Sequence, residues 1–169
     1  MSPVHLILAA VTLQRLVELV HGSRNAARLI AAGGVEVGRQ HYPALVALHA
    51  AWLGALWLLV PGDAAIAWPF LGLFVLLQLG RLWVLWHLGR YWTTRIITLP
   101  GAPLVAGGPF RFCRHPNYLV VAGEIASLPL AFGAWRLALI FSLLNAALLA
   151  WRIRVENAAL ATRRAIGAQ

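Results

Sequence analysis

The sequence predicts an all-α integral membrane protein with about five transmembrane helices, the last two of which form a C-terminal helical hairpin. Of its 169 residues, 61% are hydrophobic and only 11% are charged, whereas a soluble domain carries about 25% charged residues. Five apolar runs follow one another, with lengths near the ~20 residues that a helix needs to cross a bilayer. No repeat or linker divides them, so we expect a single membrane domain over residues 1–169.

The five predicted spans differ in length. The first three cover about residues 3–20, 43–60 and 64–88, and each is long enough to cross a membrane. The last two cover about residues 117–132 and 136–151 and are slightly short. The connection between them is so tight that they must form an antiparallel hairpin. None of the five shows the strict alternation of apolar and polar residues that is typical of outer-membrane barrel strands. All five are also longer than such strands, which have about ten residues.

The arginines predict the orientation of these spans. They gather after the first span, after the third span and in the tail: Arg24, Arg28, Arg39, Arg90, Arg95, Arg111, Arg114, Arg152, Arg154, Arg163 and Arg164. The opposite side carries only Asp63 and Arg136 between its spans. Because short basic loops stay in the cytoplasm, we expect the N-terminus outside and the C-terminus inside.

Composition and motifs exclude several classes of partner and site. The net charge of +9 is divided among three membrane-flanking segments without an aromatic groove between them, so we expect contacts with membrane lipids and not with nucleic acid. A single cysteine, Cys113, excludes an internal disulfide and a cysteine-rich zinc site. The six histidines form no zinc-hydrolase pattern, so no metal site is predicted.

The segment 107–118, between the third and fourth predicted spans, is the strongest candidate for a functional site. It places Arg111, Arg114 and His115 at the edge of long apolar runs, where charged groups are costly unless they bind something. Two prolines interrupt helix formation there, and Gly108 lets the backbone approach a ligand closely. We therefore predict a binding loop that leads into a helix.

Helical spacing indicates which polar residues of the last two spans can meet. Arg152 and Glu156 are one turn apart on a helix that extends beyond the fifth span. The hairpin returns this helix to the start of the fourth span, so His115, Tyr118 and Glu156 are candidates to line one pocket. Glu124, nine residues after His115, lies inside the fourth span and must be paired or held neutral.

Simpler readings exist for several of these residues. Glu156 is also a plausible i,i+4 ion-pair partner of Arg152 alone, and His115 is a plausible helix-capping residue before a proline. Arg111 is also explained as a positive charge at the membrane interface whose only role is to set the orientation of the protein in the membrane. Arg15 and Glu18 are three residues apart in the first span, and we interpret them as a structural pair.

Three strings stand out between residues 79 and 160. The longest is Gly-Pro-Phe-Arg-Phe-Cys-Arg-His-Pro-Asn-Tyr at 108–118. The others are Leu-Gly-Arg-Tyr-Trp at 88–92, followed by Arg95, and Arg-Ile-Arg-Val-Glu at 152–156. In these strings the sequence resembles the isoprenylcysteine carboxyl methyltransferase (ICMT) family, integral membrane enzymes that use S-adenosylmethionine and are related to phospholipid methyltransferases. The resemblance covers residues 79–160, which we expect to form the methyltransferase core.

The resemblance implies a S-adenosylmethionine site at the cytoplasmic end of the last two spans. His115, Pro116 and Tyr118 would form one wall of this site and Glu156 the other. A cofactor that carries an ammonium, a sulfonium and a carboxylate needs an acid, a base and aromatic faces. The implied binding residues are His115, Pro116, Tyr118, Glu156, Arg114, Arg152 and Gly108. The family often shows two adjacent acids where this chain has Glu156 and Asn157.

The implied reaction is methyl transfer to an oxygen of a lipophilic acceptor that enters from the bilayer. Arg90 and Arg95 are candidate catalytic residues that orient an anionic oxygen, and Glu124 is expected to orient Arg95 or to accept a proton from a hydroxyl. The chain has no lysine and is rich in alanine and arginine, which is typical of GC-rich bacteria. We therefore expect an enzyme of the bacterial inner membrane whose active site faces the cytoplasm.

The acceptor and the class of function stay open at this point. A hydroxyl on an alkylpyrone or alkylresorcinol and a carboxylate of the isoprenylcysteine type both fit the resemblance. The alternative class is a non-catalytic membrane protein, such as a small transporter or a lipid-binding subunit. A transporter would show polar residues near the middle of several spans, whereas here we expect the polar residues to gather at one face.

Overall fold

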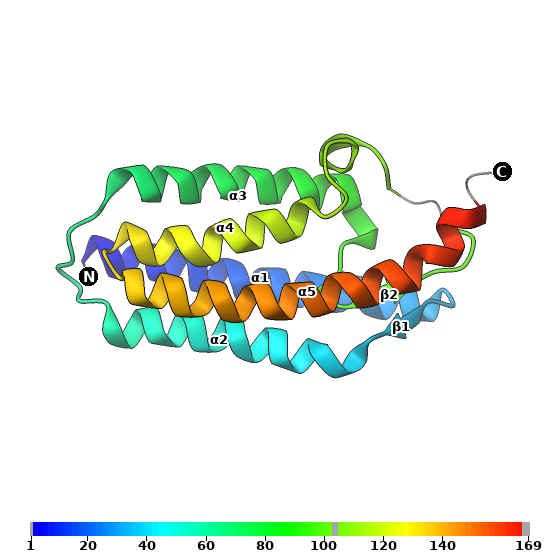
Figure 1. The fold of residues 1–169 in the computed structure, drawn as a ribbon, viewed down its shortest axis with the longest axis horizontal. Coiled ribbons are helices and arrows are strands. Elements are labelled where there is room, and N and C mark those ends of the chain that lie inside the picture. The colour runs from blue at the N-terminus through cyan, green and yellow to red at the C-terminus, as the bar shows by residue number, and fades with distance from the viewer. Residues whose placement is uncertain (1, 103–104, 167–169) are drawn as a thin grey trace.

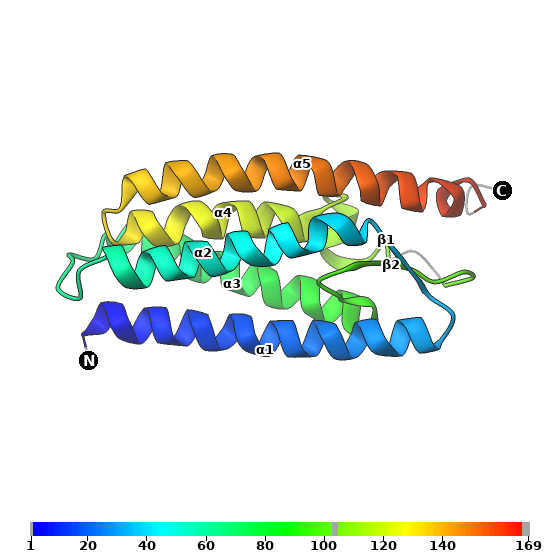
Figure 2. The ribbon, with the colours of Figure 1, turned by 90° about the horizontal axis from the view of Figure 1, so that it is seen from below.

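The computed structural model describes residues 2–102 and 105–166, with side chains up to residue 160. These residues form five long helices that run lengthwise beside one another in one bundle (Figures 1 and 2). The helices are α1 (Pro3–Ala31), α2 (Tyr42–Leu59), α3 (Trp68–Leu88), α4 (Pro116–Ala131) and α5 (Trp135–Ile166). The predicted all-α membrane fold is confirmed.

Among the described residues, four helices are long and apolar enough to cross a membrane, namely α1, α2, α3 and α5. The fourth in sequence, α4, has 16 residues, fewer than the ~20 that a crossing helix needs. It packs between α3 and α5, and Ile125 and Leu128 on it are almost fully buried. The shortest of the five α-helices is therefore a central helix of the bundle.

Prolines and glycines set the ends of these helices. Proline occupies one of the first two positions of α1, α2, α3 and α4, where its missing N–H has no helical partner to lose. Between α4 and α5 the chain turns within three residues, with Gly133 at φ +71°, a conformation that glycine adopts at low cost. The predicted C-terminal hairpin is present.

A short antiparallel sheet joins two segments for which the sequence predicted no helix or strand. Strand β1 (Val35–Val37) follows α1, and strand β2 (Ile96–Thr98) follows α3, with Glu36 opposite Ile97. Both strands lie at the end of the bundle toward which the C-terminal part of α5 extends (Figure 1). We call this the sheet end.

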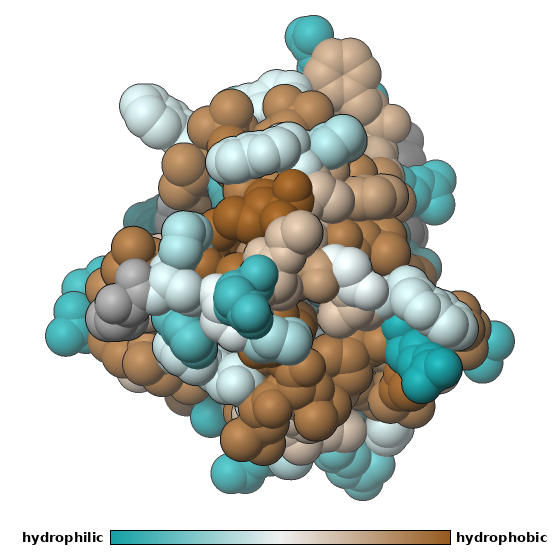
Figure 3. Space-filling model, turned by 90° about the vertical axis from the view of Figure 1, so that its left-hand side faces the viewer, coloured by the Kyte–Doolittle hydropathy of each residue, from teal (hydrophilic) through white to brown (hydrophobic). Residues whose placement is uncertain are grey.

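The opposite end carries the N-terminus and the connections α2–α3 and α4–α5 (Figure 1). Figure 3 looks onto this end, where brown and pale side chains cover most of the face and teal ones are scattered.

Residues 89–95 link α3 to β2, and we call this segment the strap. Its support comes from α1, because Asn25 Nδ2 donates to the carbonyl oxygen of Trp92 at 2.9 Å and to that of Gly89 at 3.3 Å. A Cβ added to Gly22 would lie 3.1 Å from the side chains of Thr94 and Trp92. The absence of a side chain at Gly22 thus lets the strap lie directly on α1.

Replacing Asn25 with alanine is expected to lower the free energy of unfolding by about 1–3 kcal/mol, because the buried carbonyl group of Trp92 would lose its donor. Thermal unfolding in detergent would measure the change. Arg24→Ala, at the exposed neighbouring position, is the matched control and should change the free energy by no more than about 0.5 kcal/mol. Equal effects of the two substitutions would contradict the anchoring role of Asn25.

Candidate functional site

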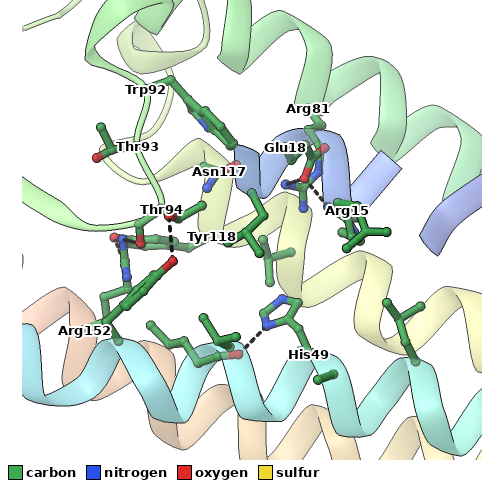
Figure 4. A pocket seen from close by; sticks show the side chains of 18 of the residues that line it. Arg15, Glu18, His49, Arg81, Trp92, Thr93, Thr94, Asn117, Tyr118 and Arg152 are labelled. Carbon is green, nitrogen blue, oxygen red and sulfur yellow. Dashed lines mark hydrogen bonds and ion pairs between the residues drawn. The ribbon is translucent and has the colours of Figure 1, made fainter. Parts of the chain in front are cut away.

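Two cavities lie side by side in the part of the chain that the structure describes. The first, of about 140 Å³, lies at the sheet end between the strap, the start of α4 and α5, and we call it the end cavity. The second, of about 250 Å³, lies among α1, α2, α4, α5 and the strap, and we call it the interior cavity (Figure 4).

The end cavity brings together the three residues that helical spacing suggested. Tyr118 Oη donates to Glu156 Oε2 at 2.5 Å, and His115 Nδ1 lies 3.6 Å from the same oxygen. The rings of His115 and Tyr118 are stacked, with centroids 5.3 Å apart and planes inclined by 15°. One wall of the end cavity is therefore aromatic, and a carboxylate faces it from α5.

Arg152 enters this arrangement through Tyr118 and not through Glu156 directly. Its Nε donates to Tyr118 Oη at 2.8 Å, and its Nη2 donates to the carbonyl oxygen of Thr94 at 2.9 Å. Arg152 is only 7% exposed, so the guanidinium is held between α4 and the strap. The expected neighbours Arg152 and Glu156 are thus linked by the Tyr118 hydroxyl.

Three further residues singled out in the sequence line the end cavity, namely Pro116, Arg114 and Arg95. Arg95 Nη1 pairs with Glu36 Oε2 at 3.1 Å, and its guanidinium lies over the Tyr42 ring. The expected contact between Glu124 and Arg95 is wrong, because Glu124 is buried within α4 whereas Arg95 is held by Glu36 of strand β1.

Three expected site residues, Glu124, Arg90 and Gly108, line neither cavity. Arg90 is exposed, and its Nη2 donates to the Tyr91 hydroxyl at 2.9 Å. Gly108 has φ +58° and packs so closely against His87 that an added Cβ would lie 2.1 Å from that ring. The need for glycine at 108 therefore comes from packing on α3.

The carboxylate of Glu124 belongs instead to a buried ion cluster that we call the charge quartet, formed by Arg15, Glu18, Arg81 and Glu124. Arg15 Nη2 lies 2.9 Å from Glu124 Oε2 and its Nη1 lies 2.8 Å from Glu18 Oε2. Arg81 Nη1 lies 3.1 Å from Glu18 Oε2, and its Nη2 also contacts Glu124. Gln78 donates to Glu124 Oε1 at 2.7 Å. Two positive and two negative side chains thus pair across α1, α3 and α4.

The charge quartet corrects one expectation and confirms another. Polar side chains do not gather at one face, because the charge quartet lies within the bundle. The Arg15–Glu18 pair is present as expected. The sequence analysis did not identify Arg81. Its signal is that it is the single Arg, Lys, Asp or Glu within the apolar run 68–88, because a lone charge inside a predicted span indicates a buried partner.

The interior cavity has mainly apolar walls with a few polar groups. Leucine and valine side chains of α1 and α2 face it, while Arg15, Glu18 and Arg81 of the charge quartet form one part of its lining. His49 Nδ1 pairs with the carbonyl oxygen of Leu45 at 2.9 Å, and the ring lies on the α2 side (Figure 4).

The interior cavity reaches the lipid-facing surface between α1 and α2. Two of its lining residues are well exposed, Leu16 on α1 at 56% and Val46 on α2 at 39%. Because both are apolar, this opening offers an apolar molecule a route from the bilayer into the bundle.

The two cavities share a wall, which we call the border. Five of the described side chains line both: Trp92, Thr93, Asn117, Tyr118 and Arg152. Trp92 Nε1 and Asn117 Oδ1 are buried there without a hydrogen-bond partner among the described residues, and so is His115 Nε2 in the end cavity. Unpaired buried polar atoms of this kind are unusual in folded proteins.

Comparison with known proteins agrees with the family expected from the sequence. Residues 70–162 match the model of the Isoprenylcysteine carboxyl methyltransferase (ICMT) family. A protein of Bacillus subtilis (strain 168), described as uncharacterized protein YpbQ, is 36% identical over 159 residues, which cover 92% of this chain and 95% of that protein. No solved structure matches the chain significantly. The chain belongs to the isoprenylcysteine carboxyl methyltransferase family.

Proposed function

We propose that this membrane methyltransferase binds S-adenosylmethionine in the end cavity and transfers its methyl group to an oxygen of a lipophilic acceptor held in the interior cavity. The single observation that carries the proposal is the border. A cavity that carries charged and aromatic side chains and a largely apolar cavity meet at one wall. A polar methyl donor and an apolar acceptor could therefore approach each other from opposite sides of that wall.

The residues of the end cavity fit the proposed donor. When bound, S-adenosylmethionine supplies an electrophilic methyl group on a positively charged sulfur. Glu156 is the acid that suits the ammonium group, and Arg114 and Arg95 are cations that suit the carboxylate. The stacked rings of His115 and Tyr118 offer an aromatic face for a cation or for adenine. The unpaired Nε2 of His115 is available for a further hydrogen bond.

The interior cavity fits an acceptor with a long apolar part. Its opening between α1 and α2 would admit the acceptor sideways from the lipid, while its apolar walls would hold the hydrocarbon away from water. Holding both reactants at one wall converts an encounter in solution into a positioned reaction, and excluding water prevents wasteful hydrolysis. We propose a hydroxyl of the alkylpyrone type or a carboxylate as the reacting group.

We place the protein in a bacterial inner membrane with the end cavity facing the cytoplasm. Support comes from the arginines, since the loops and the tail that surround the sheet end carry most of the positive charge of the chain. A polar methyl donor made in the cytoplasm would then reach the end cavity directly.

Transfer of a labelled methyl group would test the proposal. The purified full chain in detergent or lipid discs would be incubated with methyl-labelled S-adenosylmethionine and a lipid extract. We expect label in a lipid-soluble product that alkali either cleaves, as for a methyl ester, or leaves intact, as for an ether. If the protein neither bound the donor nor labelled any lipid, the proposal would be wrong.

A further inference from the structure

We propose that His49 is a catalytic residue of the methyl transfer and takes the proton from a hydroxyl group of the acceptor in the interior cavity. This inference rests on the proposed function and assigns a residue role at the same site. His49 lies on α2, outside residues 70–162 that match the family model. The acceptor hydroxyl then arrives with its proton and loses it to His49 as the methyl group is transferred.

The position of His49 in the sequence is unusual. Residues 43–59 contain one titratable side chain, which is that of His49. The other members of this run are alanine, leucine, valine, glycine, proline and tryptophan. An ionisable residue inside a membrane span is rare, and it is a candidate for a functional role by default.

A hydrogen bond to the backbone fixes which nitrogen of the His49 ring is basic. Nδ1 lies 2.9 Å from the carbonyl oxygen of Leu45. A carbonyl oxygen can only accept a hydrogen bond, so Nδ1 carries the proton of the neutral ring and Nε2 holds a lone pair. Nε2 has no hydrogen-bond partner among the described residues. It is therefore available to accept a proton from a ligand.

The His49 ring faces the wall at which methyl transfer is proposed. His49 lines the interior cavity and not the end cavity. Figure 4 shows it on α2, across the interior cavity from Asn117 and Tyr118 of the border. A hydroxyl oxygen held between them can direct a lone pair toward the border and the donor while its O–H bond points toward Nε2 of His49.

The other candidate proton acceptors of the interior cavity are already engaged. Glu18 pairs with both arginines of the charge quartet. The hydroxyls of Tyr42 and Tyr118 each have a hydrogen-bond partner. Glu124, to which the sequence assigned proton acceptance, lines neither cavity. Among the described residues that line the interior cavity, His49 is therefore the one with an unpaired basic atom.

The step balances with His49 as the proton acceptor. A lone pair of the hydroxyl oxygen forms the bond to the methyl carbon while the carbon–sulfur bond breaks, and the electrons of that bond go to sulfur. The O–H proton moves to Nε2, so a neutral ether, a neutral thioether and an imidazolium result. The imidazolium returns its proton to water once the product has left. A positioned proton acceptor typically accelerates such a step by about 100- to 10,000-fold.

The charged and titratable groups around His49 come from every helix that lines the interior cavity. The charge quartet contributes two arginines and two carboxylates, which are ion-paired, from α1, α3 and α4. Arg152 reaches the cavity from α5, Tyr118 from α4, and Tyr42 from α2 itself. Arginine stays charged and tyrosine stays protonated near neutral pH. Among the described residues that line this cavity, His49 is therefore the one whose protonation changes near neutral pH.

The pH dependence of one reaction would test the inference on the purified full chain. The acceptor is a 3-alkylphenol, whose hydroxyl ionises near pH 10 as that of tyrosine does, and the donor is kept saturating. We expect the wild-type single-turnover rate to change less than about threefold between pH 7 and pH 9, because a neutral imidazole takes the proton. In His49→Gln the rate at pH 7 should fall about 100-fold or more. It should then rise about 100-fold by pH 9, as the ionised phenol increases from about 0.1% to about 10%.

Two further variants separate proton acceptance from structure. His49→Phe suits an apolar span and should show the same loss at pH 7 and the same recovery at pH 9. His5→Gln is the matched control, because His5 also lies in a long apolar helix but lines neither cavity. We expect it to keep the wild-type rate and pH profile. Calorimetric titration of the donor should give unchanged affinity in all three variants, which shows that they are folded.

Several results would overturn the inference while leaving the proposed function intact. Wild-type rates at pH 7 in His49→Gln and His49→Phe would show that no proton passes to His49. A loss of rate that does not recover at pH 9 would assign His49 a structural role. So would a wild-type enzyme that methylates a fatty acid of equal chain length and not the phenol exclude proton acceptance. Failure of the wild type to bind the donor would overturn the proposed function, and this inference with it.

Discussion

Replacing Arg81 with methionine is expected to lower the free energy of unfolding by about 3–5 kcal/mol, because breaking a buried ion pair leaves an uncompensated charge. Arg81 is 4% exposed and pairs with both Glu18 and Glu124. Its removal would leave the two carboxylates of the charge quartet with Arg15 as their remaining partner in that cluster. Thermal or denaturant unfolding in detergent would measure the loss.

A double substitution separates charge from packing in this prediction. Arg81→Met combined with Glu124→Gln restores neutrality of the charge quartet, and we expect it to be more stable than Arg81→Met alone. Arg136→Met, which removes an exposed arginine at the start of α5, is the control and should change the free energy by about 0.5 kcal/mol or less. If Arg81→Met matched this control, the charge quartet would have no stabilising role.

Replacing Tyr118 with phenylalanine is expected to weaken binding of S-adenosylmethionine by about 10- to 100-fold. The substitution removes one hydroxyl that accepts from Arg152 and donates to Glu156. Hydrogen bonds to charged groups contribute about 1.5–3 kcal/mol each, and 1.4 kcal/mol corresponds to a tenfold change in affinity. Without the hydroxyl, Glu156 would lose its fixed position on the wall of the end cavity. Calorimetric titration of the donor would measure the effect.

Tyr91→Phe is the matched control for this prediction. Tyr91 also lines the end cavity, but its hydroxyl bonds to the exposed Arg90. We expect its donor affinity to stay within about twofold of the wild type. A comparable loss in both variants would show that any tyrosine hydroxyl in this region matters, and would remove the special role of the Arg152–Tyr118–Glu156 link.

The sequence predicted the helices because a segment that crosses the hydrocarbon core of a bilayer must be apolar along its whole length. Apolar runs near the length of the bilayer mark spans, and the boundaries expected at 43–60 and 117–132 differ by one residue from those of α2 and α4. The central position of α4 was not predictable from its length alone. The sheet also escaped prediction, because β1 and β2 are three residues each and pair across 61 positions of sequence between Glu36 and Ile97.

The contacts in the end cavity were predictable where they follow directly from the hairpin of α4 and α5. A tight hairpin necessarily brings the start of α4 beside the C-terminal part of α5, so His115, Tyr118 and Glu156 meet. Contacts made by α1 were not predictable, because Asn25 reaches the strap and Arg15 reaches Glu124 across long sequence separations. The same limit produced the wrong pairing of Glu124 with Arg95, since one sequence does not reveal which of several buried charges face each other.

Binding of S-adenosylmethionine to Glu156→Gln tests the central claim most directly. This substitution keeps the size of the side chain and removes the negative charge opposite the His115–Tyr118 stack. We expect calorimetry to show a single site in the wild type, about 10-fold or weaker binding in Glu156→Gln, and wild-type affinity in Arg136→Gln. Undiminished donor binding by Glu156→Gln would contradict the assignment of the end cavity to the methyl donor.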